Sequence, residues 1–171
     1  MRTFKKLLMC ATLAISAVAH AQPTQQQLID DFSGPYIGAK VGVNISSASG
    51  AVNKPTHTTL FPGFVAGYGF NAGPVVLGAE LFMDMHNGSS TAKDGGVDAK
   101  IGYPIGPFMP YARLGATGDW PGWTFHYGLG VEYKLTTKFS VFSEWTRDSA
   151  NAYNTRWTNN SITVGANYRF K

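Results

Sequence analysis

The stretch YGLGVEYKLTTKFSVFSEW, residues 127–145, places two glutamates, Glu132 and Glu144, among mostly apolar neighbours. Every second residue of the segment 123–135 is apolar, namely Trp123, Phe125, Tyr127, Leu129, Val131, Tyr133 and Leu135. The residues between them are small, polar or charged. Such alternation predicts a β-strand with two unlike faces. The fold therefore depends on whether the apolar face meets a protein core or a lipid bilayer.

The same alternation recurs along the chain and predicts seven further strands. They are expected in 35–46, 63–71, 74–86, 97–105, 110–117, 139–146 and 162–170. Each approaches the ~9–11 residues that a tilted strand needs to cross a bilayer. The connections alternate between tight turns (71–74, 105–109, 136–138) and longer polar segments (47–60, 87–96, 117–122, 147–161). Short turns at one end and longer loops at the other are typical of outer-membrane barrels.

The composition of the two faces indicates which one meets lipid. The polar face carries all the charges between the strand ends: Lys40, Glu80, Asp84, Asp98, Lys100, Arg113, Glu132, Glu144 and Arg169. It is also rich in glycine, which suits the crowded lumen of an eight-stranded barrel. The apolar face is uncharged, as a lipid-facing surface must be. We therefore expect an all-β fold, an eight-stranded antiparallel up-and-down transmembrane β-barrel over 35–170.

Aromatic residues near the strand ends are candidates for two interfacial girdles. We expect an outer girdle of Trp120, Trp123 and Trp145, and an inner girdle of Tyr103, Tyr133, Tyr168 and Phe170. The alternative is that they are ordinary sheet aromatics, which strands favour in any case.

The N-terminus resembles a secretory signal peptide. Basic residues are followed by an apolar run over 7–18 and by Ala19-His20-Ala21, so cleavage is expected after Ala21. No later segment has the apolar length of a membrane-spanning helix. Residues 22–34 are polar and are expected to form a flexible periplasmic segment. Without residues 1–21 the chain has no cysteine and nearly balanced charges, which argues against disulfides and nucleic-acid binding.

Six segments occur in an order that resembles one protein family. They are GPYIGAKVGVN (34–44), GAELFMD (78–84), DAKIGYPI (98–105), YARLGA (111–116), GLGVEYKLT (128–136) and ITVGANYRF (162–170). Together they resemble the transmembrane domain of the outer membrane protein A (OmpA) family. The resemblance implies a bacterial outer-membrane barrel with a periplasmic N-terminus, and roles in envelope integrity, surface interaction and slow solute passage. The partners to expect are membrane lipid, lipopolysaccharide and the barrel-assembly machinery, and the protein is expected to be monomeric.

The resemblance also carries two departures. Long family members add a periplasmic peptidoglycan-binding domain, and because this chain stops at Lys171 we expect no such tethering. The family's lumenal gate has a lysine corresponding to Lys100, acids corresponding to Glu80 and Glu132, and an arginine corresponding to Phe142. An aromatic residue in place of the arginine predicts a more firmly closed lumen. On the residues themselves, we expect Lys100 to pair with Glu80, Glu132 or both, and Arg113 with nearby acids.

Two other functions remain open at this stage. The first is a surface adhesion or immune-evasion protein that binds a host ligand through its loops. The second is a lipid-modifying barrel enzyme using a histidine, for which His57, His86 and His126 are the candidates. The sequence spacing does not bring a nucleophile, a base and an orienting group together, as a catalytic site requires. Three dispersed histidines also make a poor metal site. We therefore expect no catalytic, cofactor or metal residues.

Overall fold

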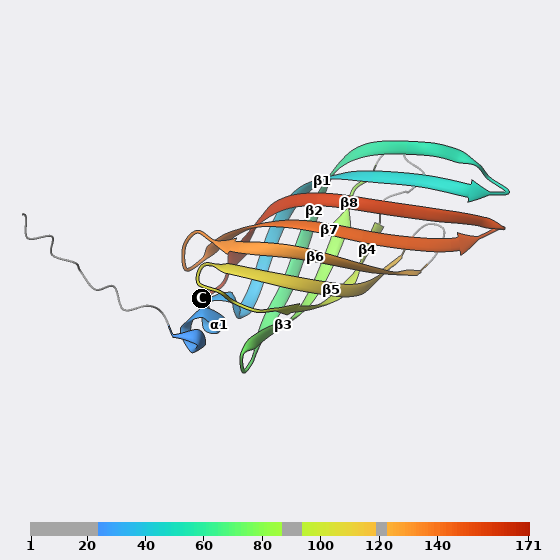
Figure 1. The fold of residues 1–171 in the computed structure, drawn as a ribbon. Helices are drawn as coiled ribbons and strands as arrows, with labels where there is room; N and C mark the ends of the chain where they lie inside the picture. Colours follow the sequence, from blue (N-terminus) through green and yellow to red (C-terminus); the bar gives the residue numbers. More distant parts are fainter. Residues whose placement is uncertain (1–23, 87–93, 119–122) are drawn as a thin grey trace, which may run out of the picture.

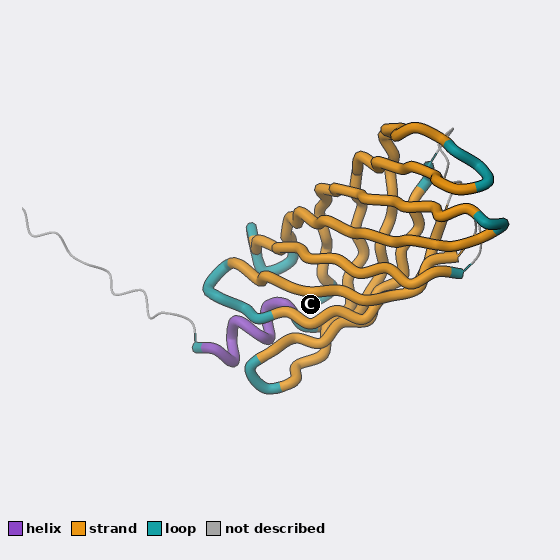
Figure 2. Tube along the Cα trace, turned by 45° about the vertical axis from the view of Figure 1, so that its right-hand side comes forward, coloured by secondary structure: helices purple, strands orange, loops and turns teal. Residues whose placement is uncertain are grey.

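The computed structural model describes residues 24–86, 94–118 and 123–171, and shows a closed barrel of eight strands (Figures 1 and 2). The strands are β1 (Gly34–Gly50), β2 (Lys54–Ala72), β3 (Val75–Asp84), β4 (Asp94–Gly102), β5 (Phe108–Gly118), β6 (Thr124–Lys134), β7 (Phe139–Ala152) and β8 (Thr155–Arg169). Each pairs antiparallel with the next, and β1 pairs with β8 to close the barrel. The expected eight-stranded up-and-down barrel is confirmed. The expected signal peptide, 1–21, lies outside the described residues.

The two faces of the strands point as the alternation predicts. Glu132 and Glu144 point into the lumen and are only 4% and 3% exposed. Their neighbour Leu129 points outward and is 61% exposed. Leu129 belongs to a broad belt of exposed apolar side chains, larger than a water-facing surface carries, and on this wall the belt faces the hydrocarbon of a bilayer.

Two hairpins extend well beyond the bilayer. The segments 47–60 and 147–161 were expected to be loops, but β1, β2, β7 and β8 run through most of them. A tight turn joins β7 to β8, where Tyr153 and Asn154 have φ values of 53° and 54°, as a type I′ hairpin turn requires. Because β1 stays paired with β8 as far as Gly50 and Thr155, the four strands form one projecting ribbon. We call it the outer ribbon (residues 46–60 and 147–161).

The outward-facing side chains mark where the bilayer ends. On β1 the outward positions are apolar from Ile37 to Ile45, and Ser47 is the next. Nine residues of tilted strand match the thickness of the hydrocarbon core. On β7 the change lies between Trp145 and Arg147. The ribbon therefore lies outside the membrane, on the side opposite the short turns.

Most of the candidate girdle residues lie at least partly exposed near the two ends of the barrel wall. Trp123, Tyr103 and Phe170 are exposed on the outer wall, at 75%, 48% and 51%. Tyr133 is also exposed, at 36%, and Tyr168 and Trp145 are half-buried. Trp120 lies outside the described residues. Their role at the membrane interface stays a prediction.

The segment before β1 differs from expectation, because it is helical over Gln25–Phe32 (α1). Thr24 caps this helix: its side chain accepts a hydrogen bond from the backbone N–H of Gln27, and Gln27 bonds back to the backbone of Thr24. No helix among the described residues is long and apolar enough to cross a membrane. The expectation of a flexible segment at 22–34 was therefore wrong for its helical part.

The helix closes the end of the barrel where the short turns and the C-terminus lie (Figure 2). Ile29 and Phe32 are each 1% exposed and form an apolar cluster with Val76 and Met109 of the barrel. At the rim, Gln25 Nε2 donates to the carbonyl oxygen of Pro104 at 3.2 Å. A lid formed by an amphipathic helix thus fills the inner mouth.

Candidate functional site in the barrel lumen

The lumenal side chains form three layers, which we name by their distance from α1. The inner layer centres on Arg169 of β8 and Glu132 of β6, whose Nη2 and Oε1 atoms are 2.8 Å apart. Ser140 donates a hydrogen bond to the same carboxylate oxygen at 2.5 Å. Arg169 also lies over the ring of Tyr36, 4.7 Å from its centroid. All four side chains are buried, so this pair is shielded from water.

The middle layer is a network that joins β3, β4, β5 and β7. Lys100 Nζ lies 2.6 Å from Glu80 Oε2 and 3.9 Å from Glu144 Oε2. Arg113 forms ion pairs with Asp98 and Glu144, and its Nη2 lies 3.7 Å from Glu80 Oε1. Each cation therefore contacts more than one carboxylate. Such sharing offsets the cost of burying the charges.

Two tyrosines complete the middle layer. Tyr36 donates to Glu80 Oε2 at 2.7 Å and Tyr111 donates to Glu144 Oε2 at 2.9 Å. Glycine opposite each ring makes the approach possible. A Cβ on Gly67 would lie 2.6 Å from Tyr36 Cζ, and one on Gly130 would lie 2.4 Å from Tyr111 Cζ. Glycines on the polar face are thus places where large side chains cross the lumen.

The strand register explains why the network spans the lumen. Directly opposite residues carry like charges: Glu80 faces Asp98 across β3 and β4, and Lys100 faces Arg113 across β4 and β5. Like charges in opposite positions repel. Compensation must come from diagonal neighbours and from Glu144 on the far side, so the strands around the lumen are tied to one another.

The outer layer faces the ribbon end and is less completely paired. Lys40 Nζ lies 3.0 Å from Asp84 Oδ1, and His86 Nε2 lies 3.6 Å from Asp94 Oδ1. His86 follows the end of β3, is 4% exposed and packs against the ring of Phe61. Asp148 accepts a hydrogen bond from Asn159 at 2.9 Å.

The structure places each expected lumenal charge inside the barrel. Lys100 contacts Glu80, which is one of its two expected partners. Glu132, the other expected partner, pairs with Arg169 instead. Phe142, at the position of the family's arginine, is 6% exposed, and Lys100 Nζ lies 5.9 Å from its ring centroid. Its ring therefore lies inside the lumen beside the Lys100 side chain.

Sequence reasoning missed several residues that contribute to these layers. They are Tyr36, Tyr111 and Ser140 in the inner and middle layers, and Asp94, Asp148 and Asn159 in the outer layer. Those on the expected strands share the parity of the charged residues, which could have identified them. Asp94 was assigned to a loop and Asp148 and Asn159 to another, so the alternation was not followed there.

The histidines are placed differently from one another. His57 is exposed on the outer ribbon, whereas His86 and His126 are each 4% exposed in the lumen. His126 Nε2 lies 2.6 Å from Asp98 Oδ1, and the ring packs edge-on against Phe82. Of the three candidate histidines, His126 is thus the one that contacts an acid of the middle layer.

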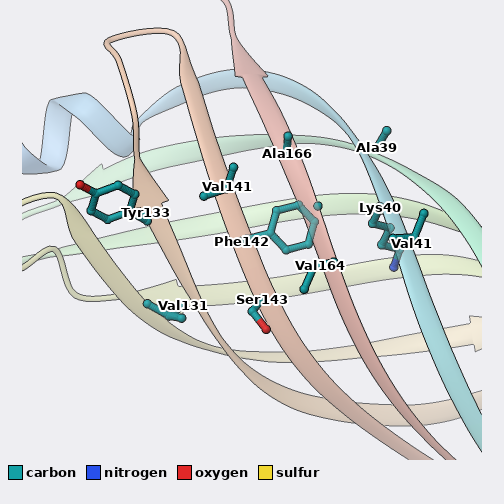
Figure 3. A pocket seen from close by; sticks show the side chains of 11 residues that line it. Ala39, Lys40, Val41, Val131, Tyr133, Val141, Phe142, Ser143, Val164 and Ala166 are labelled. Carbon is teal, nitrogen blue, oxygen red and sulfur yellow. The ribbon is translucent and has the colours of Figure 1, made fainter.

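A hollow on the outer wall is a separate feature. Figure 3 shows its lining, which comes from β6, β7, β8 and β1. Small outward residues, Ala39, Ser143 and Ala166, line it together with larger ones such as Tyr133. Its lining is almost entirely apolar. In a membrane this surface is covered by acyl chains.

Comparison with known proteins assigns the family. Residues 8–170 match the family model described as the outer membrane protein beta-barrel domain. Outer membrane protein A of Escherichia coli O157:H7 is 31% identical over 167 residues, covering 79% of this chain and 47% of that protein. The corresponding protein of Salmonella typhi is 30% identical, with 79% and 48% covered. The chain thus spans about half the length of these relatives.

Solved structures show the same fold. Neisserial surface protein A (NspA) superposes with a TM-score of 0.56 at 20% identity, covering 81% of this chain and 98% of that one. Ail, the attachment invasion locus protein of Yersinia pestis, gives 0.50 at 16% identity, with 80% and 99% covered. The barrel, the outward apolar belt and the family match agree. The chain belongs to the outer membrane protein beta-barrel family, is similar to OmpA, and resides in the bacterial outer membrane.

Proposed function

We propose that this outer-membrane barrel has a structural role in the cell envelope and that its lumen is closed to solutes. The observation that carries the proposal is the combination of a middle layer of shared ion pairs with the helical lid. An eight-stranded lumen has room for little beyond its own side chains. Two lumenal cavities among the described residues, one lined by Lys40 and Asp84 and the other by Lys100 and Glu132, each have a volume of about 20 Å³, which is space for about one water molecule.

Single-channel conductance of residues 22–171 in planar bilayers tests closure. We expect no conductance steps from the wild type. The variant Ile29→Ser/Phe32→Ser, which undocks α1, should also stay silent because the middle layer still crosses the lumen. Adding Lys100→Ala and Glu80→Ala removes a cation and an anion together, and should produce steps. Steps of equal size from the wild type would overturn the proposal.

The envelope role needs a cellular test. Deleting the gene in its own host should increase leakage of a periplasmic enzyme into the medium, and expression of the wild-type chain should restore retention. Unchanged leakage after deletion would refute the envelope role without affecting lumen closure. Contacts with lipopolysaccharide and with the assembly machinery belong to the same proposal, and co-purification from the outer membrane would test them.

The outer ribbon supports a second candidate function, recognition of a surface ligand. It carries Lys54, Arg147 and Arg156 against one acid, Asp148. Ail, a structural relative, has been solved with the heparin analogue sucrose octasulfate. Retention on immobilised heparin should be lost in Arg147→Ser/Arg156→Ser and kept in the control Lys138→Ser, which changes a short turn at the opposite end. No retention of the wild type would exclude this ligand class.

A further inference from the structure

We propose that Asp84, His86 and Asp94 form a Zn²⁺-binding site at the outer mouth of the lumen. Asp84 ends β3, Asp94 begins β4, and the two face each other in the strand register. His86 lies two residues beyond Asp84. One potential ligand atom from each residue lies within 4.8 Å of the other two. The proposal concerns ligand binding and does not depend on whether the lumen conducts.

The separation of the ligand atoms fits a shared metal better than a hydrogen bond. His86 Nε2 and Asp94 Oδ1 are 3.6 Å apart, and the buried Asp94 Oδ1 has no hydrogen-bond partner among the described residues. Tetrahedral Zn²⁺ binds nitrogen and oxygen at about 2.0–2.2 Å, which puts two ligand atoms about 3.3–3.6 Å apart. The imidazole and this carboxylate therefore already have nearly the spacing that a common Zn²⁺ would impose.

The charges around the cluster favour a cation. The polar cavity at this level is lined by three carboxylates, Asp84, Asp94 and Asp148, and by Lys40 and Arg113. Arg113 is engaged by Asp98 and by Glu144 in the middle layer. Of the two cations that line this cavity, Lys40 is the one paired with an acid of the outer layer. Carboxylates directly opposite on paired strands repel, and a bound divalent cation would relieve that repulsion.

Lys40 is the internal competitor for this site. Its ammonium lies 3.0 Å from Asp84 Oδ1 and holds that carboxylate when no metal is bound. A metal on the same carboxylate must displace the ammonium or bind beside it. Removing the ammonium should therefore strengthen metal binding, whereas a purely structural cluster would only lose stability.

The ligand set and its access select the metal. One imidazole with two carboxylates suits Zn²⁺, whereas Ca²⁺ and Mg²⁺ prefer sites built from oxygen alone. Three protein ligands leave the fourth position to water. The side chain of Asp94 is 26% exposed, so the site is open to ions arriving from outside the cell.

Isothermal titration of ZnCl2 into untagged, chelator-treated residues 22–171 in detergent tests the proposal. We expect one saturable site, with affinity at least tenfold lower in His86→Ala and Asp94→Asn and unchanged in the control His57→Ala. Lys40→Met should bind more tightly than the wild type, and MgCl2 should not compete. Absorption by bound Co²⁺ of tetrahedral intensity should disappear in the same two variants.

Three outcomes would overturn it. They are the absence of a saturable Zn²⁺ site in the wild type, equal loss of affinity in His57→Ala and His86→Ala, and weaker binding by Lys40→Met. A boiling-dependent gel shift establishes that each variant is folded before titration. Because Asp94→Asn preserves size and shape, it keeps the test decisive even if His86→Ala fails to fold.

Discussion

The two ends of the lumen are built from the same alternation but are completed in different ways. At the inner end, Arg169 and Glu132 are paired and α1 covers them with Ile29 and Phe32. At the outer end, three carboxylates face Lys40 and no comparable apolar lid is found among the described residues. Inward polarity by itself does not determine function. In the closure that we propose, the apolar lid and the middle layer act together, whereas the acids at the outer end suit the proposed cation.

Breaking the middle layer should have the largest effect. Arg113→Met leaves Asp98 and Glu144 buried without their shared cation, and loss of one partner of a buried ion pair typically costs about 3–5 kcal/mol. Urea titration of the boiling-dependent gel shift in lipid vesicles measures the loss. The matched control is Arg156→Met, on the exposed ribbon, which should change the free energy of unfolding by less than about 0.5 kcal/mol. Equal effects would mean that the lumenal pairs do not stabilise the barrel.

Undocking α1 sharpens the contrast between the ends. Ile29→Ser/Phe32→Ser should make the free energy of docking α1 onto the barrel less favourable by about 3 kcal/mol or more, since each buried side chain contributes about 1.5–3 kcal/mol. Hydrogen exchange should show faster exchange in 25–32, with the strand amides unchanged. Gln26→Ala, on the exposed side of the helix, serves as control. Equal acceleration in the strands would show that the lid and the barrel unfold together.

The strands could be predicted wherever the bilayer gives their two faces different surroundings. Between Ile37 and Ile45 one face meets lipid and the other the lumen, so alternation is strong. Beyond Ile45 the outward face of the ribbon no longer meets lipid, and outward residues such as Ser47 and Thr58 are polar, so the apolar alternation ends although inward residues such as Trp157 stay buried. This is why 47–60 and 147–161 were expected to be loops. The helix had a signal that was overlooked, the capping pair Thr24 and Gln27.

The lumenal site could be predicted in composition but not in pairing. Parity places Lys100, Glu80 and Glu132 on one face, yet which acid Lys100 reaches depends on the stagger between strands. That stagger puts Lys100 opposite Arg113 and leaves Glu132 with Arg169. The proposed metal cluster has no sequence signature, because its two acids are ten residues apart in sequence and only one histidine takes part.

A smaller effect separates the two faces of one strand. A Cβ on Gly165 would lie 2.5 Å from Phe142 Cζ and 2.6 Å from the carbonyl oxygen of Ala39, so Gly165→Ala should destabilise the barrel by about 1–3 kcal/mol. Its neighbour Ala166 faces the hollow in the lipid-facing wall, where Ala166→Val has room. Comparing the urea midpoints checks this, and equal destabilisation by both changes would contradict the assignment of faces.

The smallest expected effect concerns the helix cap. Thr24→Ala removes the side-chain acceptor for the Gln27 N–H and should cost the helix about 1 kcal/mol. Exchange in the first turn of α1 should rise about fivefold, while Thr24→Ser retains the wild-type rate. An unchanged rate in Thr24→Ala would show that docking, rather than capping, fixes the start of the helix.

The most direct test of the closed inner end is the reactivity of a single thiol beneath the lid. Residues 22–171 contain no cysteine, and Val76 is 4% exposed in the cluster with Ile29 and Phe32. In Val76→Cys, a charged, membrane-impermeant thiol reagent should react at least a hundredfold more slowly than with a free thiol. Adding Ile29→Ser/Phe32→Ser should restore fast reaction. Fast reaction with the lid intact would contradict a lumen sealed by α1.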